Sequence, residues 1–203
     1  MSNKGYKSFA SHYILLPDGR IEKWPIVTVD GSGVILHLEW RDNFKERPNL
    51  EMHPGILLPG FVDLCETNFG NEEIAPNFNR HFAHGTILLG SSYSHQNKPL
   101  PRLLPPNIID EDCPNFLLRD GEMDISLFQR MKEYHQNSSE HKLSEILFWA
   151  TQWGASRTEF GNQLGQLKEG FKPGVMVLQK VDLNAMRLAH EAQVKWLSAP
   201  IFD

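Results

Sequence analysis

The stretch from Gly55 to Thr67 constrains the fold of this chain more than any other part of the sequence. It contains two apolar runs, at 56–58 and 61–64, separated by Pro59-Gly60. A proline followed by a glycine interrupts a strand and turns the chain. We therefore predict that residues 56–58 close one layer of the protein. Residues 61–64 begin a buried strand of a second layer.

The chain before this stretch is typical of short strands. Runs at 13–16, 25–29 and 34–38 are separated by the turn signals Pro17-Asp18-Gly19 and Asp30-Gly-Ser-Gly33. Residues 46–52 are polar and predict a loop or an edge strand. No helix is expected here.

The chain after Leu64 changes to a helix-and-strand pattern. A short helix is predicted within 71–84, Gly85 would end it, and 86–89 reads as a buried strand. Strand, helix and strand in this order form a βαβ unit, whose two strands should be parallel.

A proline-rich segment follows at 98–120, with prolines at 99, 101, 105, 106 and 114 among apolar residues. This mixture predicts an extended arm on an apolar surface. The arm lies either on its own domain or on a neighbouring subunit.

The last third predicts two helices and then strands. Asp124 can cap the first helix, which ends near 137–139, and the second covers about 142–154, with Trp149 and Trp153 facing the core or an interface. Strands are predicted at 164–167 and 175–178, with a last edge strand at 194–197.

The composition limits the function classes. The 203 residues carry a net charge of −5, which argues against a nucleic-acid binder. No apolar run is long enough to span a membrane, and the N-terminus lacks the apolar core of a signal peptide. The two cysteines form no disulfide framework or zinc motif. We expect a cytoplasmic protein.

Three pieces of the sequence together resemble the amidohydrolase superfamily of metal-dependent hydrolases. They are Leu58-Pro-Gly-Phe-Val-Asp63, the helical segment 143–155, and the Gly-x-Leu-x-x-Gly segment at 164–178. The last piece has Pro173-Gly174 where Ala-Asp is usual in the family. With the residues up to Leu188, it is most similar to bacterial amidohydrolases resembling aminodeoxyfutalosine deaminase.

The resemblance implies an α+β chain with two parts. Residues 7–58 and 161–200 would form a composite β-sandwich built from N- and C-terminal strands. Residues 59–160 would hold a short βαβ remnant of a TIM barrel, two or three helices and the arm at 98–120. A complete (β/α)₈ barrel takes about 250 residues, so the segment 59–160 is too short to close one.

The family's chemistry uses a divalent metal, usually zinc, to activate a water molecule. The resemblance places two metal-binding histidines at positions 65 and 67. Here these positions are Cys65 and Thr67. Threonine is a poor substitute for imidazole. We therefore expect no cofactor, and zinc or another divalent metal only if the chain is active.

Several residues remain weak candidates for a rebuilt site. His81 and His84 share one face of the predicted helix, and His95 or Cys65 could add a further metal ligand. Asp63 and Glu66 could pair for acid–base chemistry. For each there is a plainer interpretation: the histidines as helix-surface or interface residues, and Asp63 as a buried residue at a strand end that hydrogen-bonds to the backbone.

Three hypotheses for function follow. The first is an amidohydrolase-like protein without catalysis that acts as a structural or binding homodimer, because a truncated barrel leaves strand edges to be covered. The second is a small metal-dependent hydrolase of non-peptide C–N bonds with a rebuilt metal site. The third is a binding partner of a full-length amidohydrolase.

Overall fold

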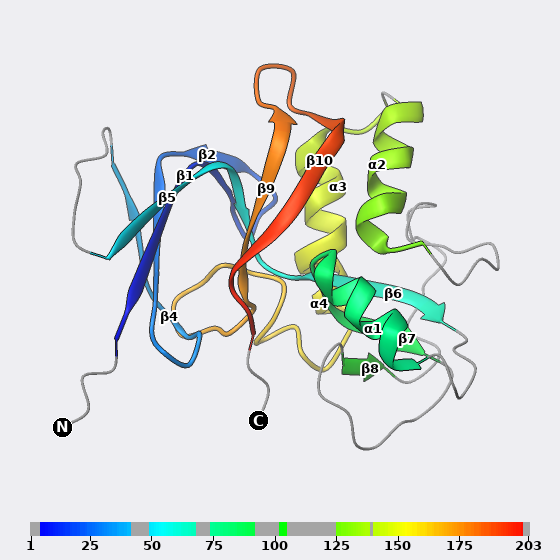
Figure 1. The fold of residues 1–203 in the computed structure, drawn as a ribbon, viewed down its shortest axis with the longest axis horizontal. Helices are drawn as coiled ribbons and strands as arrows, with labels where there is room; N and C mark the ends of the chain where they lie inside the picture. Colours follow the sequence, from blue (N-terminus) through cyan, green and yellow to red (C-terminus); the bar gives the residue numbers. More distant parts are fainter. Residues whose placement is uncertain are drawn as a thin grey trace.

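The computed structural model describes residues 5–41, 49–67, 74–91, 102–104, 125–138 and 140–200. Two sheets and a group of helices account for most of them (Figure 1). None of the described helices is long and apolar enough to cross a membrane.

The larger sheet has seven strands and combines both ends of the chain. Its path runs β10-β9-β5-β1-β3-β4, and β2 pairs with β1. All pairs are antiparallel except β1 with β5. The strands are β1 (Lys7–Leu15), β2 (Ile21–Lys23), β3 (Pro25–Val29), β4 (Ile35–Trp40), β5 (Leu50–Leu58), β9 (Val175–Asp182) and β10 (Arg187–Ser198). The strand predictions at 25–29, 56–58, 175–178 and 194–197 are confirmed, although β10 is much longer than predicted.

The larger sheet curls so that strands far apart in its order share one core. Ile35 at the start of β4 donates its backbone N–H to the Phe171 carbonyl at 2.9 Å and accepts from the Gly170 N–H at 2.8 Å. These bonds bring β4 to the segment that leads into β9. The enclosed core contains Phe9, Ile14, Val27, Val29, Ile35, Leu57, Leu167, Val175 and Val177.

The smaller sheet contains the predicted βαβ unit. Strands β6 (Phe61–Thr67) and β7 (Thr86–Ser91) are parallel and are connected through helix α1 (Ile74–Ala83). Pro76 lies in the first turn of α1, where its missing N–H costs nothing. β8 (Arg102–Leu104) adds a third parallel strand beside β7. The rest of the predicted arm at 98–120 lies outside the described residues.

The helices after the smaller sheet in the chain pack against both sheets. α2 (Leu127–Asn137) packs against β10, and α3 (Leu143–Phe148) continues through a π-helical turn, Trp149–Trp153, into α4 (Gly154–Ser156). In Figure 1, α2 and α3 stand beside the β9–β10 hairpin. Trp149 and Trp153 are partly buried against the core, as predicted.

Two local predictions are wrong for identifiable reasons. The N-cap of α2 is Ser126, whose Oγ accepts a hydrogen bond from the Gln129 N–H, whereas Asp124 lies outside the described residues. The predicted strand at 164–167 is a series of turns. Gly165 has a φ of 77°, which lies outside the range of regular strand backbone and turns the chain here. Leu164 and Leu167 consequently enter two different cores.

The junction at Pro59-Gly60 passes the chain from one sheet to the other, as the sequence predicted. The Gly60 N–H donates to the Pro173 carbonyl at 3.1 Å, and the Phe61 N–H donates to the Gly85 carbonyl at 2.8 Å. A Cβ on Gly60 would overlap the Ile87 side chain. The α+β class is therefore confirmed. The interpretation as a sandwich with a barrel remnant stays a prediction.

We predict that Gly55→Ala destabilises the larger sheet severely. Gly55 has a φ of 136°, and a Cβ there would overlap the Leu178 carbonyl oxygen, where β5 meets β9. The free energy of unfolding should fall by about 3 kcal/mol or more, measured by urea denaturation.

Gly170→Ala is the matched control. Its φ of 83° is also positive, but nothing lies within 4 Å of the added Cβ. It should cost only about 1–2 kcal/mol. Equal losses in the two variants would mean that the close approach of β5 to β9 is not what requires glycine.

Candidate functional site

The strongest polar feature of the small sheet is Asp63, in the middle of β6. Its neighbours Val62 and Leu64 point into an apolar core that also contains Ala155 and Leu164. Because side chains alternate along a strand, Asp63 lies on the opposite face of β6. Its side chain is completely buried there, so it needs a partner within the protein.

Arg130 of α2 supplies that partner. Its Nη2 donates to Asp63 Oδ1 at 2.6 Å, and its side chain is only 9% exposed. The Nε and Nη1 atoms of Arg130 have no acceptor among the described residues. Asp63 is thus in contact with a permanently charged guanidinium, which is a poor setting for a ligand of a metal cation.

A second polar contact lies near the start of α2. His84, directly after α1, has its Nδ1 2.7 Å from the Oγ of Ser126, the N-cap of α2. Burial lowers the pKa of His84 below its usual value, and the positive charges of Arg80 and Lys132 lower it further. The neutral imidazole is therefore favoured. The contact between His84 and Ser126 therefore links the end of α1 to the start of α2, the helix that also carries Arg130.

The structure confirms a helix that carries His81, but this helix ends at Ala83, so His84 lies just beyond it and the two residues have different surroundings. His81 is 1% exposed, whereas His84 is half-buried and bonded to Ser126. The His84 N–H donates to the His81 carbonyl in the last turn. The two residues are close in the chain, yet the imidazole of His84 is already committed to a serine.

The other predicted site residues are only partly located. Cys65, Glu66 and Thr67 belong to β6, and their side chains lie outside the described part of the chain. His95 is also outside the described residues. Among the residues that the structure does describe, no three His, Cys, Asp or Glu side chains are grouped closely enough to hold a metal ion.

Sequence reasoning missed Arg130 and Ser126. Arg130 follows Gln129 in an amphipathic helix, a position that usually faces solvent. Its partner is 67 residues away in the chain, so no local pattern connects them. Ser126 could have been found, because a serine directly before a helical apolar run is an N-cap signal.

Comparison with known proteins supports the fold. No protein-family model matches the sequence, and no curated protein matches it. Among solved structures, a zinc-bound adenosine deaminase from Xanthomonas campestris matches with a TM-score of 0.60 and 11% identity. The match covers 90% of this chain and 87% of that chain. The chain shares its fold with this deaminase.

Other matches are shorter. An N-acetyl-D-glucosamine-6-phosphate deacetylase from Mycobacterium smegmatis matches with a TM-score of 0.35 and 16% identity over 43% of this chain and 24% of that chain. A prolidase matches with a TM-score of 0.37 and 17% identity over 50% and 31%. This chain thus spans about a quarter to a third of their length. These structural neighbours are amidohydrolase-superfamily members.

We predict strong coupling between Asp63 and Arg130. Removing one partner of a buried pair leaves an uncompensated charge and costs about 3–5 kcal/mol. Arg130→Met and Asp63→Asn should therefore each lower the free energy of unfolding by about that amount. The double variant should lose clearly less than the sum, measured by urea denaturation in a double-mutant cycle.

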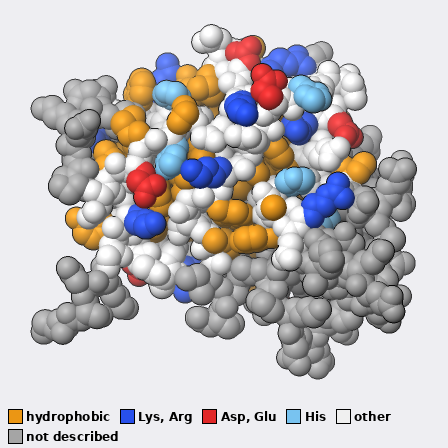
Figure 2. Space-filling model, in the orientation of Figure 1, with side chains coloured by type: hydrophobic (Ala, Val, Ile, Leu, Met, Phe, Trp, Pro, Cys, Tyr) orange, Lys and Arg blue, Asp and Glu red, His pale blue; other side chains and the backbone are white. Residues whose placement is uncertain are grey.

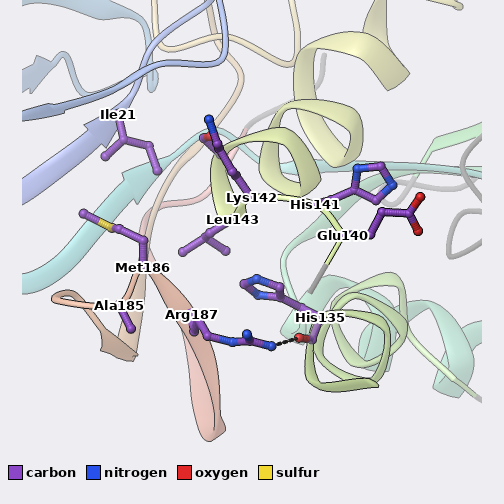
Figure 3. Close-up of a pocket in the computed structure, with 10 residues that line it drawn as sticks. Ile21, His135, Glu140, His141, Lys142, Leu143, Ala185, Met186 and Arg187 are labelled. Carbon is purple, nitrogen blue, oxygen red and sulfur yellow. Dashed lines mark hydrogen bonds between the residues drawn. The ribbon is translucent and has the colours of Figure 1, made fainter. Parts of the chain in front are cut away.

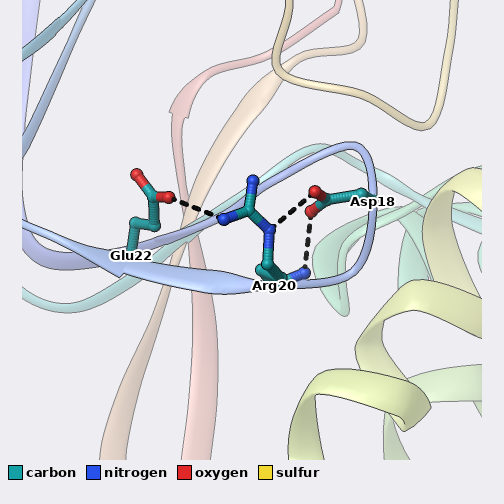
Figure 4. A network of polar contacts seen from close by, with 3 residues as sticks. All are labelled: Asp18, Arg20 and Glu22. Carbon is teal, nitrogen blue, oxygen red and sulfur yellow. Dashed lines mark hydrogen bonds and ion pairs between the residues drawn. The ribbon is translucent and has the colours of Figure 1, made fainter.

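The exposed network at the β1–β2 turn is the matched control (Figure 4). Arg20 donates to Asp18 at 2.7 Å and to Glu22 at 3.3 Å, with 67% of its side chain exposed. Arg20→Gln should leave the urea midpoint close to that of the wild type, because water screens exposed pairs. Additive losses in the Asp63–Arg130 cycle would contradict the predicted coupling.

We also predict that His84 makes folding sensitive to acid. Because its pKa is lowered in the folded chain, the unfolded chain binds more protons as the pH falls below about 6.5. The free energy of unfolding should therefore decrease between pH 7 and pH 5. The decrease should be smaller in His84→Gln, followed by urea denaturation at each pH. An unchanged pH dependence in that variant would show that His84 is not responsible.

Proposed function

We propose that this chain is an amidohydrolase-superfamily relative without hydrolytic activity, which acts as a structural or binding homodimer. The observation that carries the proposal is the buried pair of Asp63 and Arg130. Asp63 is the one acidic residue of the Pro-Gly-Phe-Val-Asp stretch that carries the resemblance, and its Oδ1 is bonded to a guanidinium at 2.6 Å.

This pairing works against both kinds of chemistry open to Asp63. A divalent cation would have to approach a carboxylate that already has a positive charge in contact, and the two cations repel each other. A general base must be within hydrogen-bond reach of a substrate proton. Asp63 is completely buried, so a substrate would first have to displace α2.

The strand count of the smaller sheet supports a truncated barrel. A closed (β/α)₈ barrel needs eight parallel strands. The described part of the small sheet has three, in the order β6-β7-β8. On this interpretation, 7–58 with 161–200 is the composite β-sandwich and 59–160 is what remains of the barrel. The Lys-Pro-Gly variant at 172–174 favours descent near bacterial aminodeoxyfutalosine-deaminase-like proteins.

Exposed apolar groups support association with a second copy of the chain. The smaller sheet ends on β8 and the larger path ends on β4, with no further described strand beside either. The face shown in Figure 2 carries an apolar area among charged side chains of both signs. Large exposed apolar residues over the described chain are Tyr6, Trp24, Leu36, Trp40 and Met52. Unpaired strand edges and exposed aromatic residues favour protein contacts.

One observation favours the alternative, a small metal-dependent hydrolase of C–N bonds with zinc or another divalent metal. The structural neighbour with the highest TM-score reported above is a deaminase with bound zinc. In this case His81, His84 and His95 would supply the metal ligands, with Cys65 or Glu66 nearby. The third possibility is that this chain binds a full-length amidohydrolase. As in the first proposal, the chain itself would then have no hydrolytic activity.

Elemental analysis together with light scattering separates these functions. We expect protein purified without chelator in a cytoplasmic host to contain no stoichiometric metal and to have the mass of a dimer. Stoichiometric zinc or another divalent metal would contradict the proposal that the chain has no hydrolytic activity, and it would support the metal-dependent hydrolase. A metal-free compact monomer would contradict the homodimer. It would favour the third possibility, in which a full-length amidohydrolase covers the exposed strand edges.

A further inference from the structure

A pocket of about 520 Å³ lies between three elements that are distant in the sequence. Ile21 of β2 lines one side, the connection from α2 to α3 lines a second, and the turn from β9 to β10 lines the third (Figure 3). The volume is within the usual range for small-molecule sites, about 300–1,000 Å³. None of the residues that line the pocket belongs to the Asp63–Arg130 or His84–Ser126 contacts.

Part of the pocket is apolar. Ile21, Leu143 and Met186 come from the three different elements, and in Figure 3 Ile21 and Met186 lie on the left with Leu143 nearer the centre. Met186 has a φ of 50°, an unusual conformation for a residue other than glycine. The Asp182 carboxylate holds this turn by accepting from the Asn184 and Ala185 N–H groups. The hairpin is thus fixed in a shape that brings Met186 to the pocket.

The polar side of the pocket is built around His135, which is only 4% exposed. The Leu188 N–H donates to His135 Nδ1 at 3.3 Å. Burial and, to a lesser degree, the charge of Arg187 lower the pKa of His135, so the ring is neutral near pH 7. Since Nδ1 accepts, the proton of the neutral ring is on Nε2. No described residue accepts from this Nε2–H.

Arg187 completes the polar side. Its Nη2 donates to the His135 carbonyl at 2.7 Å, which holds the guanidinium next to the imidazole ring. The remaining N–H groups of Arg187 have no acceptor among the described residues. Lys142 adds a second positive charge at the opposite edge of the pocket in Figure 3. Glu140 is the one carboxylate that lines the pocket, so the lining has a net positive charge.

We propose that this pocket binds a small organic carboxylate with an apolar body. The carboxylate accepts from the guanidinium of Arg187 and from the Nε2–H of His135. The apolar body lies against Ile21, Leu143 and Met186. Planar guanidinium groups bind carboxylates through paired hydrogen bonds, and a buried neutral donor beside them adds direction.

Titration of the full chain with hexanoate tests this site, followed by NMR of the histidine rings and methionine methyl groups. We expect saturable binding that shifts the signals of His135 and Met186. Arg187→Gln should weaken binding about tenfold, the usual effect of losing a charged hydrogen bond. Arg41→Gln is the matched control, because it removes the same charge at the end of β4, where Arg41 pairs with Glu39. It should bind hexanoate like the wild type.

Two further probes separate the parts of the site. 1-Hexanol keeps the apolar body without the charge, and inorganic phosphate keeps the charge without the apolar body. Both should bind at least tenfold more weakly than hexanoate. Equal binding of either probe, or the absence of saturable hexanoate binding, would overturn the proposal.

Equal effects of Arg187→Gln and Arg41→Gln would also overturn the proposal. The urea midpoint of each variant shows whether it is folded. If Arg187→Gln does not fold, Arg187→Lys replaces it, since it keeps the charge but lacks the planar fork. Arg187→Lys should weaken hexanoate binding about threefold. An unchanged affinity for hexanoate would overturn the assigned contact between Arg187 and the carboxylate.

Discussion

The ion pair between Asp63 and Arg130 joins the two halves of this structure. Asp63 belongs to the small parallel sheet, and Arg130 belongs to α2, which packs against β10 of the large sheet. The pair is buried on both sides, so neither charge has water as an alternative partner. Such a pair adds little net stability compared with apolar residues, but it penalises any arrangement that separates its partners. Moving α2 away from β6 would leave both charges buried without a partner.

The same pair shapes what this fold can do. In the resemblance described above, the stretch ending at Asp63 leads into the positions of two metal ligands. Here the carboxylate is already neutralised by an arginine, and α2 covers the face of β6 that carries it. The chain shares the fold of a zinc-bound adenosine deaminase, and Asp63 in its first parallel strand is paired with Arg130. The pocket at His135 and Arg187 lies elsewhere, where the hairpin β9–β10 approaches the helices.

Much of the fold could be predicted from the sequence. Pro59-Gly60 marked the change of sheet, and the apolar runs at 25–29 and 86–89 marked buried strands, because these signals are local. The chain at 164–167 shows the limit of this approach. Its apolar spacing is compatible with a strand, but the positive φ of Gly165 directs the two leucines into separate cores. β10 was largely missed because most of its residues are at least partly exposed and its apolar pattern is weak.

The candidate site was less predictable for a physical reason. The sequence suggested Asp63 either as an acid–base residue or as a buried residue bonded to the backbone, whereas the structure pairs it with the side chain of Arg130. The identity of the partner depends on how α2 packs on β6, which is a tertiary contact between residues 67 positions apart. The pocket similarly combines residues from β2, α2–α3 and β9–β10. No sequence window contains them together.

Crystals soaked in zinc and measured by anomalous diffraction test most directly whether β6, where Asp63 is paired with Arg130, binds a metal ion. We expect no zinc within coordination distance of the Asp63 carboxylate and the guanidinium of Arg130 still bonded to it. A zinc ion bound to Asp63, with Arg130 displaced, would contradict the proposal that the chain has no hydrolytic activity.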